Sequence, residues 1–321
     1  MSDSVASRPA SALAIVEAGA KPRHPIEIVA WMNEEGSRFV PVMMGSGVFC
    51  KDFTLEHAYA SKDVAGKTVQ EELQRIGYVG DEEPGQHPIG GYFEAHIEQG
   101  PVLLDLDLPL GAVLGTFGVE RHAITFHGQA AHSGSTPMNR RKDAFLAAAK
   151  MSSEIYQIAE RSGNGVCTIG SCTTKPGIVT SVVEECRITL DQRHLDPAKL
   201  ATMLAEAKAA SESFAKEGNV RVSWERIWQI APRPFNNDLV ALCDESIRET
   251  CGKSHRLPSG PLHDAAEVAF ADVLTVMMFV QSLHGISHNK IEDTREEHLE
   301  LCVTAFDKLA EKVMGWICKG H

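Results

Sequence analysis

The sequence predicts an α/β protein with a mixed sheet, interrupted by an inserted α+β domain of ferredoxin-like type. Short apolar runs that end in charged residues alternate with helical patterns near both ends of the chain. Between about residues 112 and 229 the order becomes β-α-β-β-α-β. The Pro232-Arg233-Pro234 stretch then marks a linker back to the first pattern. We therefore expect one domain from residues 1–111 and 230–321, with 112–229 inserted into it.

The first part of the chain predicts a helix, a strand, two further helices and a second strand. The apolar run 25–31 is typical of a buried strand, and 91–101 alternates like a strand until Gly-Pro breaks it. Glycines at 19 and 77 are the expected helix stops. The expected ranges are helix 12–19, strand 25–31, loop and short helix 43–60, helix 67–77 and strand 91–101.

The inserted part predicts strands at 123–128, 166–174, 186–191 and 220–225, with helices at 140–161 and 196–216. Pro197 suits the first turn of the second helix. The core faces expected of the two helices carry Phe145, Ala148, Ser152, Ile155 and Ala159, and Leu200, Met203, Leu204, Ala207 and Phe214. After the insertion we expect a helix at 237–251, a Gly/Pro loop, a strand at 271–280 and a helix at 295–317.

Composition excludes several classes of partner. The 321 residues include 31 basic and 43 acidic side chains, a net charge of −12 that disfavours nucleic acid and anionic membranes. No apolar run reaches the about 18 residues that span a bilayer. Residues 1–12 lack the apolar segment of a secretory signal. The eight cysteines are scattered without a C-x-x-C pair, which predicts reduced thiols and a cytoplasmic location.

Acidic and histidine side chains stand where predicted strands end. Glu34 and Glu35 follow the run 25–31, and His96 and His288 lie near the ends of later strands. Adjacent carboxylates point in different directions, so one can hold a metal ion while the other acts as a base on water. His and carboxylate are ligands that zinc accepts. The alternative for each is a solvated loop residue or a hydrogen-bonded histidine.

His132 lies on a Gly/Ser-rich loop of the inserted part. There it can donate a hydrogen bond to developing negative charge, or it can be a loop residue satisfied by water. Residues 33–39 (NEEGSRF), 96–101 (HIEQGP), 128–132 (GQAAH) with 136–138 (TPM), and 285–289 (GISHN) together resemble one family. It is the dinuclear-metal amidohydrolase family of N-carbamoyl-L-amino acid hydrolase, allantoate amidohydrolase and β-ureidopropionase. Aminoacylases and carboxypeptidase-like metallopeptidases are its relatives.

The resemblance implies a metal-dependent hydrolase, active on a linear C–N amide bond of an N-carbamoyl amino acid or allantoate-like substrate. It implies a phosphorylase/hydrolase-like catalytic domain, a lid that forms a homodimer, and two divalent metals per subunit (zinc, manganese, cobalt or nickel). By resemblance, Glu34 is the general base, Glu35 and His288 bind one metal, and His96 binds the other. His132 reaches the partner's site, while Arg193, Thr180, Phe117 and His263 bind substrate. For Arg193 a surface ion pair is the alternative.

Three pocket positions depart from the family pattern. Phe117 replaces a usual Gln, Thr180 a usual Asn, and Leu262 a usual Gly. Each change alters the polarity or size of the pocket, and losing a buried hydrogen-bonding group can shift substrate discrimination by orders of magnitude. The reaction class is therefore better predicted than the substrate.

Family members also carry an upstream His-x-Asp motif and a bridging Asp, for which we find no counterpart; His24 is wrongly placed to replace them. On that count one metal keeps two protein ligands and the other keeps one, which predicts weak metal binding and little or no activity of residues 1–321. The alternatives to an active amidohydrolase are a truncated or degenerate relative that binds or dimerises, and a metallopeptidase or aminoacylase.

Overall fold

The computed structural model describes residues 24–317, which form two compact units. Of the described residues, the first unit comprises 24–116 and 233–317, and the second comprises Phe117–Pro232. The boundaries thus fall at 116/117 and 232/233, where the sequence predicted 111/112 and 229/230. The shift at the first boundary arises because Leu110–Thr116 is a strand that pairs within the sheet of the first unit.

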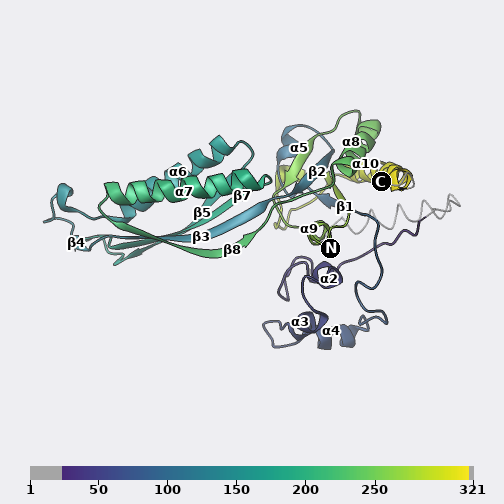
Figure 1. Ribbon diagram of the computed structural model, residues 1–321, viewed down its shortest axis with the longest axis horizontal. Helices are drawn as coiled ribbons and strands as arrows, with labels where there is room; N and C mark the ends of the chain where they lie inside the picture. The colour runs from purple at the N-terminus through teal and green to yellow at the C-terminus, as the bar shows by residue number, and fades with distance from the viewer. Residues whose placement is uncertain (1–23, 318–321) are drawn as a thin grey trace. The chain divides into compact units, whose positions relative to one another are not determined.

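A mixed sheet forms the centre of the first unit (Figure 1). Its order is β1-β11-β2-β10, and β9 pairs with β2. Strand β1 is parallel to β11, β11 is antiparallel to β2, and β2 is parallel to β10. All six residues of β11 are buried, as expected of a continuous apolar run covered on both faces. The strands are β1 (Tyr92–Ile97), β2 (Leu110–Thr116), β9 (Arg233–Pro234), β10 (Arg256–Ser259) and β11 (Thr275–Val280).

Helices α8 and α10 pack against each other and contact β11 and β2, whereas α9 contacts β1 and β11. Sequence signals set their ends: Asn236 caps α8, and α4 has a capping box between Thr68 and Glu71 and a left-handed Gly77 at its end. The helices of this unit are α2 (Met44–Phe49), α3 (Leu55–Ala60), α4 (Val69–Ile76), α5 (Val102–Asp105), α8 (Asn237–Cys251), α9 (Asp264–Phe270), α10 (Glu296–Ile317) and the 3-10 turn η2 (Leu283–Gly285).

The second unit is an antiparallel sheet of order β5-β7-β3-β8 with two long helices along one face (Figure 1). Its chain order is β-α-β-β-α-β, so the ferredoxin-like prediction is confirmed. Alternate residues of β7 are buried, as a sheet covered on one face requires. The elements are β3 (Gly118–His127), β4 (Ala131–His132), η1 (Met138–Arg140), α6 (Ala144–Ser162), β5 (Val166–Lys175), β6 (Ser181–Val182), β7 (Glu185–His194), α7 (Pro197–Glu217) and β8 (Arg221–Ile230).

Several local predictions need correction. The run 25–31 is not a strand: it has no ladder partner, and Ile26 and Ile28 are exposed. In α6, Ala148 and Ile155 are buried as predicted, but Phe145 is exposed, and Ala144, Ala147 and Met151 are buried as well. In α7, Leu200, Met203 and Ala207 are buried as predicted and Phe214 packs against the core, whereas Leu204 is only half-buried. Strand β10 and helix α9 replace part of the predicted loop, and helix 12–19 lies outside the described residues.

The core of the second unit yields a stability prediction. Ile155 on α6 is fully buried in that core, whereas the next residue, Tyr156, is 54% exposed. Ile155→Ala removes buried methyl groups and leaves a cavity, so it should lower the free energy of unfolding by about 2–5 kcal/mol. Tyr156→Ala should change it by about 0.5 kcal/mol or less. Urea unfolding followed by tryptophan fluorescence measures both, and equal effects would contradict the assigned helix face.

Candidate metal centre

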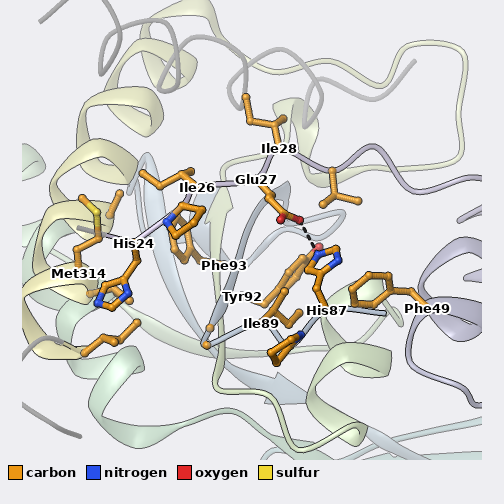
Figure 2. A pocket seen from close by; sticks show the side chains of 18 of the residues that line it. His24, Ile26, Glu27, Ile28, Phe49, His87, Ile89, Tyr92, Phe93 and Met314 are labelled. Carbon is orange, nitrogen blue, oxygen red and sulfur yellow. Dashed lines mark hydrogen bonds and ion pairs between the residues drawn. The ribbon is translucent and has the colours of Figure 1, made fainter. Parts of the chain in front are cut away.

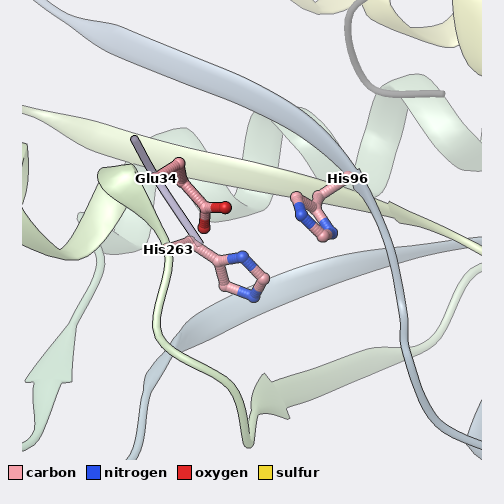
Figure 3. Close-up of side chains that lie close together, drawn as sticks. All are labelled: Glu34, His96 and His263. Atoms are coloured by element: carbon pink, nitrogen blue, oxygen red, sulfur yellow. The ribbon is translucent and has the colours of Figure 1, made fainter. Parts of the chain in front are cut away.

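Three side chains of the first unit converge: Glu34 from the loop before α2, His96 from β1 and His263 from the residue preceding α9. Each offers one ligand atom, and these atoms all lie within 4.8 Å of one another. Figure 3 shows the carboxylate and the two imidazoles directed toward a common space. The two rings are close neighbours, with centroids 4.3 Å apart. The group therefore assembles from segments far apart in the sequence.

The Glu34 loop is held by its own hydrogen bonds. Asn33 adopts a positive φ of 54°, a conformation that asparagine tolerates better than most residues. Its side-chain amide donates to the carbonyl oxygens of Phe39 (2.9 Å) and Pro41 (3.0 Å). The Met43 N–H donates to the Glu34 carbonyl at 2.7 Å. These bonds close the turn between the extended segment 25–31 and α2, and they fix the backbone position from which the Glu34 side chain extends.

Hydrogen bonds determine which imidazole nitrogens carry a lone pair. The Nδ1 of His96 lies 2.7 Å from the Ile97 carbonyl oxygen, which can only accept, so Nδ1 carries the proton and Nε2 is bare. The Ser259 hydroxyl donates to the Pro261 carbonyl and therefore accepts from His263 Nε2 at 2.8 Å. His263 Nδ1 is left as a bare nitrogen, buried and without a hydrogen-bond partner.

This donor set fits a divalent metal ion. Metal-binding histidines usually donate their second ring N–H to a carbonyl or another acceptor, as His96 and His263 do. Burial, with a smaller effect of His96, lowers the pKa of His263 well below its ordinary value, so the ring is neutral. Two neutral imidazoles and one carboxylate are the ligand types of a catalytic zinc site. The unpartnered His263 Nδ1 thus acquires a physical explanation.

Glu34 lies in an environment that favours its protonated form. Burial, reinforced by the carboxylates of Glu35 and Glu94, raises the pKa of Glu34 from 4.5 to about 7. Glu94, on β1, is only 2% exposed. Its Oε2 accepts from the Tyr92 hydroxyl at 2.7 Å and from the Ala265 N–H at 3.0 Å. Glu94 therefore links β1 to the first turn of α9, next to His263.

A second contact joins residues that the sequence singled out. The Nε2 of His288 lies 3.4 Å from the Glu35 carboxylate, and both side chains are largely exposed, at 72% and 53%. The group of three does not include them. Because Glu34 and Glu35 are adjacent, the two contacts flank one short piece of backbone. The residues predicted to bind metal therefore fall into two neighbouring sets.

In the second unit, the environment of His132 determines its tautomer. Its Nδ1 accepts from the N–H groups of Gly134 (3.0 Å) and Ser135 (3.2 Å), so the proton of the neutral ring is on Nε2. The ring is exposed and lies on β4, paired with Ser181 of β6. His132 therefore presents an N–H donor to its surroundings, the property expected of a group that stabilises negative charge.

Arg193, on β7 of the second unit, is engaged by a carboxylate. Its Nε donates to Asp191 Oδ1 at 2.7 Å and its Nη2 to Oδ2 at 3.2 Å, while Arg121 reaches the same Oδ2 at 2.7 Å. Burial alone would raise the pKa of Asp191, but these hydrogen bonds hold it below its ordinary value. The ion pair considered from the sequence is thus present. Of the other predicted substrate residues, Thr180 is exposed and Phe117 buried.

A cavity of the first unit lies apart from the candidate metal centre. It has a volume of about 490 Å³ and a mostly apolar lining (Figure 2). Trp31, Tyr92 and Phe306 line it, and Glu27 and His87 form an ion pair of 2.9 Å beside them. None of the three converging side chains lines this cavity. We therefore assign the site by its chemistry rather than by cavity size.

Comparison with known proteins identifies the family of this chain. The sequence pattern of peptidase family M20/M25/M40 matches residues 4–312. The chain belongs to this family. The family is generally dependent on two metal ions, and the resemblance carried by the four motifs is confirmed.

Named relatives of this M20 family member are amidohydrolases. The N-carbamoyl-L-amino-acid amidohydrolase of Rhizobium meliloti is 38% identical over 284 residues, which cover 87% of this chain and 67% of that protein. The allantoate amidohydrolase of Escherichia coli is 29% identical over 276 residues, covering 85% and 67%. A hydantoinase/carbamoylase family amidase from Burkholderia multivorans has a crystal structure that aligns with a TM-score of 0.89 at 38% identity, covering 95% of this chain and 74% of that one.

Sequence reasoning missed two features of this candidate site. His263 was grouped with substrate-binding residues, and its convergence with His96 was not foreseen; Glu94 was not singled out at all. A signal existed for His263, because it stands with Asp264 at the start of a helix that follows a strand. That helix was read as loop. Among residues 24–317, no helix has the length and apolarity needed to cross a membrane.

The group of three leads to a metal-binding prediction. His96→Ala and His263→Ala should each weaken zinc binding at least about tenfold, because each removes one imidazole from a small ligand set. His87→Ala, which removes an exposed histidine outside the group, is the matched control. Competition with a chromophoric chelator measures the affinity. Zinc affinity that stays constant in both site variants would contradict the assignment.

Glu267, one turn into α9, supplies a pH prediction. Burial, with a contribution from Asp52, raises its pKa from 4.5 to about 7. Between these values the unfolded chain has released the proton while the folded chain retains it, so stability falls as pH rises through this window. Above pH 7, Glu267→Gln should therefore be more stable than wild type by about 1–2 kcal/mol, allowing for partial solvent screening. The difference should vanish near pH 4 in urea unfolding, and a gain that persists there would contradict the assigned cause.

Proposed function

We propose that this chain hydrolyses a linear amide C–N bond in an N-carbamoyl amino acid or a related ureido acid. The observation that carries the proposal is the convergence of Glu34, His96 and His263 with two bare imidazole nitrogens directed inward. The names of the amidohydrolase relatives support the substrate class. Dipeptide hydrolysis is the competing activity, and no feature of the described residues favours it.

We assign the metal-binding role to two sets of side chains. His96 and His263 would hold one divalent ion beside Glu34, and the Glu35–His288 pair would bind a second next to it. A bound zinc, manganese, cobalt or nickel ion polarises a carbonyl oxygen and makes water more acidic. With His263 included, the first ion would have two imidazole ligands, where the sequence alone supplied one, and Glu34 stays available as the base.

In this mechanism Glu34 moves the proton. Its carboxylate takes a proton from the attacking water and returns it to the leaving nitrogen, which breaks the C–N bond. A pKa of about 7 suits a group that must both accept and donate near neutral pH. The Nε2–H of His132 would donate to the oxygen that becomes negative as water adds. Arg193, oriented by Asp191, would bind the substrate carboxylate through its planar guanidinium.

We also propose a homodimer joined through the inserted unit, with His132 acting in the partner's site. The supporting features are the exposed ring of His132 and the family resemblance of its loop. Phe117 and Thr180 complete the substrate pocket in this proposal and would set its selectivity, because each replaces a polar group common in the family. The small-molecule substrate class itself rests on the amidohydrolase relatives.

The test of the function is turnover by the 321-residue chain with added zinc, manganese, cobalt or nickel. We expect release of the carbamoyl group from several N-carbamoyl amino acids or from allantoate, and no cleavage of dipeptides. Glu34→Gln keeps the size of the side chain but not the base, so kcat should fall by at least about 10²-fold. A chain that binds metal but turns over none of these substrates would instead support a binding or dimerising protein.

Mixing inactive variants tests the placement of His132. Glu34→Gln and His132→Ala should each be nearly inactive alone. If His132 acts across a dimer, random exchange of subunits gives mixed dimers with one intact site, and about a quarter of wild-type activity should return. Recovery that fails although mass measurements show mixed dimers would place His132 in its own subunit's site.

A further inference from the structure

We propose that Glu292 is a positioning residue that fixes the loop carrying His288 and so sets the His288 ring against Glu35. The inference rests on the proposed function, in which Glu35 and His288 bind a metal ion. Glu292 was not singled out by any motif. It lies four residues after His288, in the segment between η2 and α10.

One carboxylate oxygen of Glu292 accepts two hydrogen bonds from the His288 loop. The Ser287 hydroxyl donates to Glu292 Oε2 at 2.5 Å, and the His288 backbone N–H donates to the same oxygen at 2.7 Å. The Glu292 N–H in turn donates to the Asn289 carbonyl at 2.9 Å. The side chain and backbone of Glu292 therefore close a tight turn around His288. Hydrogen bonds to a charged acceptor are stronger than neutral ones, so this clamp is a firm one.

The clamp holds backbone that does not adopt this conformation readily. His284 and His288 both have positive φ, at 62° and 54°, which non-glycine residues rarely adopt. Gly285 between them also has positive φ, and a Cβ there would come within 2.7 Å of the Pro101 Cα. Such conformations cost of order 1–3 kcal/mol each and persist only where surrounding contacts impose them. The hydrogen bonds from the Ser287 hydroxyl and the His288 N–H to Glu292 are contacts that hold His288 in this conformation.

The clamp acts on His288, whose exposed side chain has little packing to orient it. The His288 side chain is 72% exposed, so packing does little to hold it, yet its Nε2 lies 3.4 Å from the Glu35 carboxylate. Fixing the backbone of His288 is then the means of fixing the direction of its ring. The neighbouring acid, Asp293, is used differently: its side chain accepts from the Thr294 N–H and its carbonyl from the Leu283 N–H. Glu292 is the acid turned toward the His288 loop.

The experiment measures zinc affinity of the full chain in variants of Glu292. Glu292→Ala removes the acceptor and should weaken binding about 10- to 100-fold, as removal of a group that orients a ligand does. Glu292→Gln keeps one oxygen that can accept from both donors, and should stay within about threefold of wild type. Glu300→Ala removes the same charge from an exposed position on α10 and should leave affinity unchanged.

A double-mutant cycle separates positioning from a general effect on folding. If Glu292 acts through His288, Glu292→Ala should have no further effect on zinc affinity in a His288→Ala background. Additive losses would show that Glu292 affects binding by another route and would overturn the proposal. Equal affinities of wild type and Glu292→Ala would overturn it as well.

A second measurement keeps this inference distinct from the proposed function. Amide hydrogen exchange of His288 reports the clamp without metal, and should be at least about tenfold faster in Glu292→Ala than in wild type or Glu300→Ala. An unchanged exchange rate would overturn the clamp. If exchange accelerates but His288→Ala leaves zinc affinity unaltered, the clamp exists but His288 does not bind zinc. That outcome would contradict the metal-binding role of His288 in the proposed function.

Discussion

The parallel pairing of β1 with β11 is the constraint on which the site depends. The register places His96 beside Phe279 and Ile97 beside Val280, so both strands end at one edge of the sheet. The connection is continued by the Glu98 N–H to the Val280 carbonyl at 2.8 Å and the Gln99 N–H to the Ser282 hydroxyl at 2.9 Å. His96 and the loop that carries His288 therefore emerge from the same edge, where α/β folds commonly bind ligands.

Two acidic side chains, the buried Glu94 and the half-buried Glu34, determine much of the electrostatics of the site. Glu94 is almost fully buried, but the Tyr92 hydroxyl and the first turn of α9 donate to it. The buried Glu94 carboxylate is thus satisfied by hydrogen-bond donors fixed in the fold. One of these donors, the Ala265 N–H, belongs to the first turn of α9, where the helix dipole is positive. Burial and the carboxylates of Glu35 and Glu94 raise the pKa of Glu34 from 4.5 to about 7.

The sequence predicted those parts that local chemistry determines. The capping residues Thr68, Asn236 and Gly77, the β-α-β-β-α-β order and the strand-end position of His96 all follow from short-range patterns. The strand prediction for 25–31 was wrong because apolar composition does not distinguish a paired strand from an extended segment without a partner. The convergence of His263 with His96, and Glu94 altogether, were missed because contacts across about 170 residues of chain, as between Glu94 and Ala265, leave no local trace.

The hydrogen bonds of Ser259 have a consequence for how an ion is captured. The Ser259 hydroxyl donates its single proton to the Pro261 carbonyl, so its oxygen must accept from His263 Nε2. The proton of the neutral His263 ring is therefore on Nε2, and Nδ1 is bare. Proton positions in the site are thus dictated by the backbone, before any ligand arrives. No tautomer exchange and no rotamer search at His263 have to accompany binding, so that histidine adds little entropic cost to association. A bare nitrogen is a better ligand for zinc, cobalt or nickel than for magnesium or calcium, so in the proposed metal centre the Ser259 hydroxyl would favour the first three ions.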